Sequence, residues 1–96
     1  MKLMLVLEWS RSSFSEIGAK FARGEEATPP EGVELIPRWH DPSSRLAWVV
    51  VDSPDSVTIQ RWMVKWSDYL DWRTYTVIDD QEVGAILREQ LSLEES

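Results

Sequence analysis

The sequence contains no cysteine, a single histidine and no long apolar run. Without cysteine the chain forms no disulfide bond and no thiolate metal site, and it is compatible with a reducing cytosol. One histidine leaves carboxylates as the remaining metal ligands, and their spacing matches no familiar metal site. We therefore expect no bound metal and no cofactor.

The apolar segments are short throughout. The N-terminal run "MKLMLVLEW" is interrupted by Glu8, and no small-residue cleavage site follows it, so we do not interpret it as a secretion signal. No segment approaches the roughly twenty apolar residues that span a bilayer. We expect a soluble, cytoplasmic protein that does not enter a membrane.

Positive charge is also scarce. Ten lysines and arginines stand against 17 aspartates and glutamates, so the formal net charge is -7. Nucleic acids and anionic membranes are bound by basic surfaces, and we expect neither as a partner. RNA-recognition domains stack bases on the aromatic side chains of a similar sheet, but the segment that would be their third strand, "LAWVVVD", carries no positive charge here.

Tryptophan, by contrast, is abundant: the 96 residues include six. One small core is not expected to bury all of them, and surplus aromatic side chains tend to line interfaces or pockets. Trp62 and Trp66 fall on one face of a predicted helix, so we assign them to the core. The other four lie on predicted strands and are better candidates for an interface or a pocket: Trp9, Trp39, Trp48 and Trp72.

The periodicity of apolar residues predicts four strands and three helices. Their order is strand, helix, strand, strand, helix, strand, with a further helix at the end. This order is typical of an α+β, ferredoxin-like domain with a four-stranded antiparallel sheet. We expect one domain over residues 1–96, with a core over 2–80 and a C-terminal helix over about 80–92. The other predicted elements are strands at 2–9, 33–41, 46–52 and 71–78, a helix at 14–23, and a helix that begins near residue 53.

Local signals set the helix starts. Ser13 with Glu16 three residues later fits a capping box for the first helix. Ser53 before a proline is the expected N-cap of the second helix. Asp79 and Glu82 favour the start of the third helix.

The central strands are apolar on both faces, although two helices cover only one face of such a sheet. An uncovered apolar face would promote aggregation. We therefore expect the same face of a second copy to cover it in a homodimer. The C-terminal helix is the alternative cover, on its own chain or on the partner.

Several segments resemble the bacterial family known as domain of unknown function 3303, within the wider group of dimeric α/β barrels. The resemblance implies a dimeric α/β barrel but no activity. The wider group includes oxygenases, decarboxylases, haem-handling enzymes, isomerases and proteins without known chemistry. The segments that carry the resemblance are "MLVLEW" (4–9), Pro30-Glu31-Gly32, Trp39, "WVVVDSPD" (48–55) and "WMVKWSDYLDWRTYTVI" (62–78).

The alternation of side chains along the strands suggests a polar cluster inside the barrel. In such a cluster His40 would act as a general base oriented by a carboxylate, and Arg38 would bind an anionic group. A bulge at Pro37 would instead move Arg38 and His40 to the other face. A histidine beside a turn is also commonly an exposed strand end. The candidate site residues are Glu8, Arg38, His40, Trp48, Trp72, Thr74 and Thr76.

Two functions remain open. The first is a non-enzymatic homodimer, or one that binds a small organic ligand in an aromatic-lined cleft. The second is a monooxygenase- or isomerase-like enzyme that works without a cofactor and uses His40 together with Arg38 or Glu8.

Overall fold

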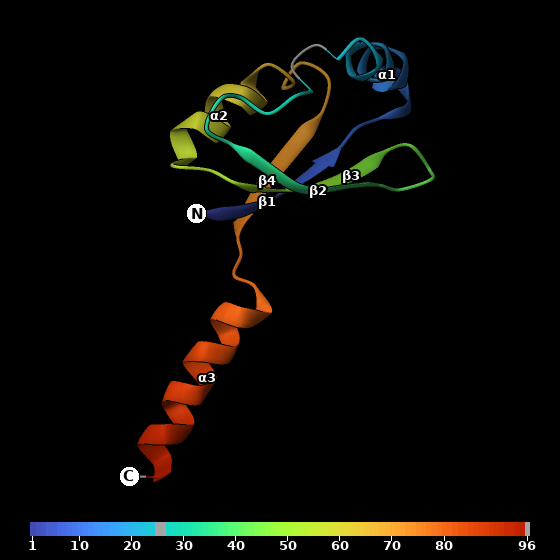
Figure 1. The fold of residues 1–96 in the computed structure, drawn as a ribbon. Coiled ribbons are helices and arrows are strands. Elements are labelled where there is room, and N and C mark those ends of the chain that lie inside the picture. The colour runs from blue at the N-terminus through green and yellow to red at the C-terminus, as the bar shows by residue number, and fades with distance from the viewer. Residues whose placement is uncertain (25–26, 96) are drawn as a thin grey trace.

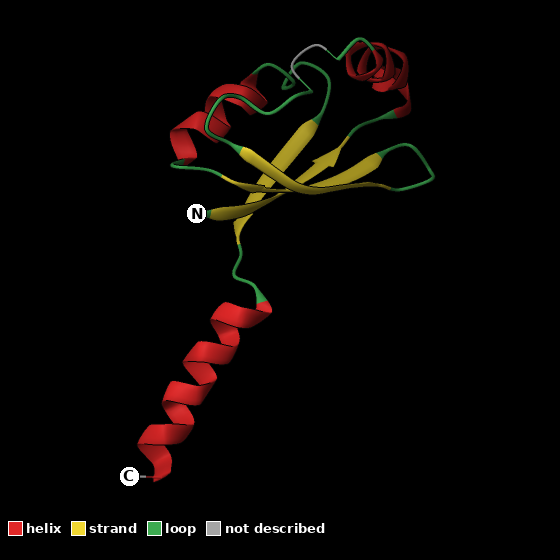
Figure 2. Cartoon of the chain, in the orientation of Figure 1, coloured by secondary structure: helices red, strands yellow, loops and turns green. Residues whose placement is uncertain are grey.

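The computed structural model describes residues 1–24 and 27–95, and it contains one four-stranded antiparallel sheet with α-helices on one of its faces (Figures 1 and 2). The strand order is β2-β3-β1-β4. This confirms the predicted α+β class and is consistent with the ferredoxin-like order. The elements are β1 (Lys2–Glu8), the 3-10 turn η1 (Arg11–Ser13), α1 (Phe14–Ala22), β2 (Glu34–His40), β3 (Leu46–Asp52), α2 (Ser56–Val64), β4 (Asp71–Thr76) and α3 (Asp80–Glu95).

The core lies between the sheet and the helix layer. β1 and β3 pair with Leu5 opposite Val49, and these side chains point toward α1 and α2. The apolar stripe of α2 and the residues after it closes the core, with Ile59, Trp62 and Trp66 buried. The assignment of Trp62 and Trp66 to the core is therefore confirmed.

The predicted capping of two helices is wrong in part. Ser13 does occupy the N-cap position of α1, but it has a helical conformation and its side chain makes no capping hydrogen bond, so there is no capping box with Glu16. The second helix begins at Ser56 with Asp55 as its N-cap, since the Asp55 side chain accepts a hydrogen bond from the Thr58 N–H at 2.7 Å. Ser53 is buried, and its hydroxyl donates to the Asp55 carbonyl at 2.7 Å instead.

β2 is an edge strand with an irregular register, as Pro37 predicted. Leu35 pairs with Val51 but Arg38 pairs with Val49, so the register shifts between Leu35 and Arg38. Proline has no N–H to donate to the ladder, and a bulge at an edge strand accommodates it. The shift decides which face of the sheet Arg38 and His40 occupy.

α3 extends away from the sheet, on the side opposite α1 and α2 (Figure 1). The described chain is accordingly elongated, with extents of 59 × 29 × 17 Å. Asp79 and Glu82 mark the start of the helix, as predicted, and they form a reciprocal capping box: the Glu82 N–H donates to Asp79 Oδ1 at 2.8 Å, and the Asp79 N–H donates to Glu82 Oε1 at 3.1 Å. The Lys2 ammonium of β1 donates to the same two carboxylates, at 3.0 Å to Asp79 and 2.8 Å to Glu82.

Within residues 1–24 and 27–95, no helix combines the length and the apolar character needed to cross a membrane.

Candidate functional site

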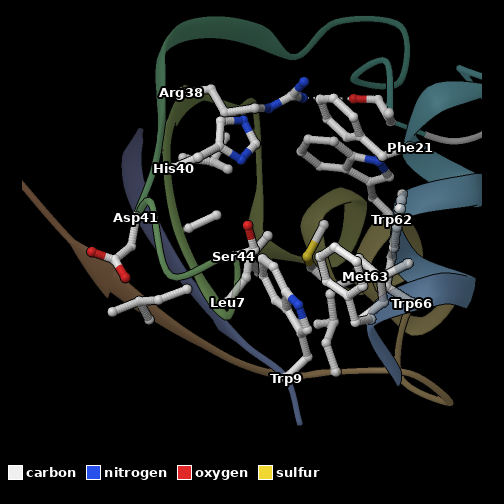
Figure 3. Close-up of a pocket in the computed structure, with 18 residues that line it drawn as sticks. Leu7, Trp9, Phe21, Arg38, His40, Asp41, Ser44, Trp62, Met63 and Trp66 are labelled. Carbon is white, nitrogen blue, oxygen red and sulfur yellow. Dashed lines mark hydrogen bonds between the residues drawn. The ribbon is translucent and has the colours of Figure 1, made fainter. Parts of the chain in front are cut away.

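A cavity of about 390 Å³ lies between the sheet and the helix layer (Figure 3). Its volume falls in the range of small-molecule sites, roughly 300–1,000 Å³. Its walls are mainly aromatic and aliphatic, and Arg38, His40, Asp41 and Ser44 provide its charged and polar side chains. The apolar lining residues come from β1, β3, α1, α2 and the adjoining loops: Leu7, Trp9, Phe14, Ile17, Phe21, Ala27, Leu46, Ala47, Val49, Trp62, Met63, Trp66 and Leu70.

A gap in the apolar stripe of α1 helps to create this cavity. Phe14, Gly18 and Phe21 follow a helical spacing and all line the cavity. A Cβ atom added at Gly18 would meet no heavy atom within 4 Å. The position between the two phenylalanines is therefore open space rather than packed core.

Arg38 places a cation at the wall of the cavity. One of its Nη2 hydrogens is donated to the Ala27 carbonyl at 2.6 Å, and its Cζ atom lies 5.3 Å from the centre of the Phe21 ring. The side chain is half-buried, and this burial lowers the pKa of the guanidinium from its ordinary value. Among the described residues, no carboxylate forms an ion pair with Arg38.

His40 lies at the mouth of the same cavity and is exposed to solvent. Its ring packs edge-on against Phe21, with centroids 5.4 Å apart and planes at 76°. The neighbouring carboxylate of Asp41 is engaged in its own turn, where it accepts hydrogen bonds from the Ser43 N–H at 3.1 Å and from the Ser43 hydroxyl. Asp41 therefore does not orient the imidazole.

The structure separates most of the predicted site residues. Arg38 and His40 share the cavity, on the helix-covered face. Glu8 and Trp48 lie on the opposite face, because they have the same parity as Val6, which pairs with Trp48. The predicted grouping of Glu8 with Arg38 and His40 is therefore wrong, and the reason is the shifted register at Pro37.

The two candidates from β4 lie at the far edge of the sheet. Trp72 and Thr74 pair with Leu7 and Leu5, so they face the helix layer, but β1 and β3 separate them from β2. The Trp72 indole N–H donates to the Ser67 hydroxyl at 2.9 Å. Neither residue lines the cavity, nor does Thr76 on the same strand, so the predicted polar cluster is not formed.

Sequence reasoning missed the contribution of α1 to the site. Phe14 and Phe21 belong to its predicted apolar stripe, yet they are 50% and 41% exposed because they wall an open cavity. The available signal was Gly18, since a glycine within an apolar helical stripe leaves a space that no side chain fills. Trp9 also lines the cavity, and its buried indole N–H has no hydrogen-bond partner in the described part of the chain.

A second apolar surface lies on the other face of the sheet, which no helix covers (Figure 2). We call it the open face, and its side chains come from all four strands. Trp39 is 57% exposed and pairs with Trp48 across β2 and β3. The apolar members are Met4, Val6, Trp39, Trp48, Val50 and Tyr75.

A third apolar surface runs along α3. We call it the α3 stripe; the exposure of its side chains ranges from 38% at Val83 to 66% at Leu93. An amphipathic helix normally buries such a stripe against another element. The members are Val83, Ile86, Leu87, Leu91 and Leu93.

The described residues contain no cluster of three or more histidine, cysteine or acidic side chains that could hold a metal ion. A family model described as "Domain of unknown function (DUF3303)" matches residues 1–91 of the chain. Searches of curated proteins and of solved structures found no match.

Proposed function

The chain belongs to the DUF3303 family, and we propose that it binds a small, largely apolar organic ligand in the cavity between α1, α2 and the sheet. The observation that carries this proposal is the cavity itself. It holds about 390 Å³ in a domain of 96 residues, and aromatic rings form much of its wall. Protein interiors are otherwise close-packed, so a space of this size is an unusual feature of a small core.

Filling the cavity from Gly18 tests this proposal. The probe is N-phenyl-1-naphthylamine, a neutral dye whose fluorescence rises in apolar sites. We expect Gly18→Leu to weaken dye binding at least about tenfold, since the new side chain occupies the space between Phe14 and Phe21. The fold should persist, because replacing a helix-interior glycine usually stabilises the helix by about 0.5–1 kcal/mol.

Ala19→Leu is the matched control. It adds a leucine to the adjacent, exposed position of α1, which does not line the cavity. Dye binding that is equally strong in the wild type, Gly18→Leu and Ala19→Leu would contradict the proposal, as would the absence of binding to the wild type.

We further propose that the chain forms a homodimer through the open face. A four-stranded sheet with strands of six or seven residues offers a face of roughly 400 Å², given strand spacing and rise per residue. A standard protein interface buries roughly 800 Å² on each partner. The open face alone is therefore small for a stable dimer, and a second surface is needed.

The α3 stripe is the natural second surface. The 16 residues of α3 span about 24 Å, enough to cross a sheet of this width. The helix extends away from its own sheet, and the contacts of Lys2 with Asp79 and Glu82 hold its first turn in that orientation. Packing of each α3 against the partner would bury both exposed apolar surfaces in one symmetric assembly.

Light scattering coupled to size exclusion tests the dimer at micromolar concentrations. We expect a dimeric mass for the wild type and a monomeric mass for Trp48→Lys, because the charge would lie in the centre of the open face. The matched control is Val57→Lys, which places the same charge at a 61% exposed position of α2 on the other side of the molecule. A monomeric wild type, or a dimer unaffected by Trp48→Lys, would contradict this part of the proposal.

The enzymatic alternative retains one supporting observation: His40 and Arg38 line the same cavity. Among residues 1–24 and 27–95 neither predicted carboxylate orients His40, because Glu8 is on the other face and Asp41 is bound to Ser43. The two functions differ in one measurement. In an enzyme, His40→Asn abolishes turnover of the bound compound and spares its binding. In a binding protein, the compound is recovered unchanged from both the wild type and the variant.

A further inference from the structure

We propose that the ligand of this cavity is an organic monocarboxylate with an apolar, preferably aromatic, body, and that Arg38 is the residue that binds its carboxylate. This inference rests on the proposed ligand-binding function and names the chemical class of the ligand. It is carried by the position of one cation in the wall of an otherwise apolar space.

Most N–H donors of the Arg38 guanidinium make no hydrogen bond with the described residues. A guanidinium carries five N–H donors, and the hydrogen bond to the Ala27 carbonyl uses one of them. The contact with Phe21 involves the ring face and needs no N–H of the guanidinium. Within residues 1–24 and 27–95, no carboxylate neutralises the charge.

The surroundings make this free charge costly. A cation among apolar side chains loses hydration, and an anion that binds there offsets the loss. Asp41 is the one carboxylate in the described lining of the cavity, and its hydrogen bonds with Ser43 hold it in the β2–β3 turn. A bound anion would therefore face Arg38 without displacing an existing ion pair.

The donor set favours a carboxylate over a phosphate. Arginine and carboxylate match as two parallel hydrogen bonds in one plane. Arg38 is the single lysine or arginine among the described lining residues, so the site supplies one positive charge for one negative charge. Phosphate sites usually add further cations or a glycine-rich loop, and neither is present in the described lining.

The apolar wall selects the rest of the ligand. Phe21 lies beside Arg38, and the rings of Trp62 and Trp66 line the cavity farther from the guanidinium (Figure 3). Aromatic rings pair favourably in stacked or edge-on geometry. A flat ring bonded to a carboxylate thus satisfies both parts of the site at once.

The probes for this inference are 2-naphthoate and 2-naphthol, which share a ring system and differ in the carboxylate. We expect the wild type to bind 2-naphthoate about tenfold more tightly than 2-naphthol, measured by calorimetry at neutral pH. Arg38→Gln should reduce the affinity for 2-naphthoate to that for 2-naphthol and leave 2-naphthol within about twofold. Arg38→Lys keeps the charge without the planar fork and should fall between the two.

Arg45→Gln is the matched control, because it removes the same charge from the nearby β2–β3 loop without touching the described lining. Unchanged 2-naphthol binding in Arg38→Gln shows that the cavity is intact in that variant. If the wild type binds both probes equally, the carboxylate inference is wrong while the proposed function stands. If it binds neither probe nor N-phenyl-1-naphthylamine, the proposed function itself fails. Undiminished 2-naphthoate binding by Arg38→Gln also contradicts the role of Arg38.

Discussion

Trp39 lies directly opposite Trp48 in the register of β2 and β3, on the face of the sheet that carries no helix. The next residue of β2, His40, pairs with Ala47 and lines the cavity on the other face. One edge strand therefore contributes adjacent residues to two separate surfaces. Substitutions at Trp39 and His40 should accordingly affect different properties, assembly in one case and ligand binding in the other.

The α3 stripe can be tested without shortening the chain. Ile86→Lys with Leu91→Lys should weaken the dimer at least about tenfold and leave the unfolding temperature of the monomer unchanged, because these side chains contact nothing on their own sheet. Ser92→Lys places a lysine on the opposite side of the same helix and should leave the dimer intact. Sedimentation equilibrium gives the dissociation constants. Equal constants for the two variants would show that α3 takes no part in assembly.

Salt should strengthen the proposed dimer. Each chain carries a net charge of -7, so two copies repel each other, whereas the proposed interface is mainly apolar. Raising the salt concentration from about 0.05 M to 0.5 M screens that repulsion and leaves the apolar contacts in place. The dissociation constant measured by light scattering should fall across this range. A rise would indicate that ion pairs between the copies dominate instead.

Acid should release the first turn of α3. The Lys2 ammonium and neighbouring N–H groups lower the pKa of Asp79 and Glu82 from their ordinary values, and the same contacts raise the pKa of Lys2. The carboxylates therefore contribute stability that is present above their unfolded pKa, about 4, and is lost as the pH falls through their lower folded pKa. The stability contributed by Lys2 is fully present below the ordinary pKa of lysine and is lost only as the pH rises toward the raised pKa of the folded state, so it does not change in this acid range.

Hydrogen exchange at α3 amides measures this effect. Protection in the first turn should decrease as the pH falls below about 4, after correction for the intrinsic exchange rate. Lys2→Met should reduce the size of that step, and Lys65→Met, an exposed site away from α3, should preserve it. The same step in both variants would show that Lys2 does not hold the helix.

Ser53 should matter more for stability than its size suggests. Its buried hydroxyl donates to the Asp55 carbonyl at 2.7 Å and accepts from the Asp55 N–H at 3.4 Å. Ser53→Ala removes both hydrogen bonds at a buried position, so the free energy of unfolding should fall by about 1–2 kcal/mol. Urea denaturation measures the change. Ser56→Ala, at an exposed position nearby, should stay within about 0.5 kcal/mol of the wild type.

The framework of the fold was predictable because strong local signals agree with the tertiary structure. The alternation and apolar runs of the strands set their positions, and the predicted 46–52 strand coincides with β3. Pro37 predicted both the edge position and the bulge of β2, since it removes a ladder hydrogen bond. The capping hydrogen bonds predicted for two serines are absent. The Ser13 side chain makes no capping hydrogen bond, and the Ser53 hydroxyl donates to the Asp55 carbonyl before α2.

The site was less predictable because it depends on non-local geometry. Parity along a strand groups Glu8 with Met4, but it does not relate Glu8 to Arg38 on a strand whose register shifts at the bulge. The sheet order places Trp72 on the edge opposite β2, and single strands carry no information about that order. A cavity is also hard to predict from a sequence, because no residue directly marks the empty space between helices and strands.

In the proposed ligand site, the open position at Gly18 would let one residue of α1 limit the size of the ligand. An alanine, valine or leucine there would shorten the space in graded steps without altering the strands, the sheet order or the open face. Size selectivity would then change by a single substitution, while the proposed assembly through the other side of the molecule is conserved. Members of the family that differ at this position would be expected to accept ligands of different length within the same proposed dimer.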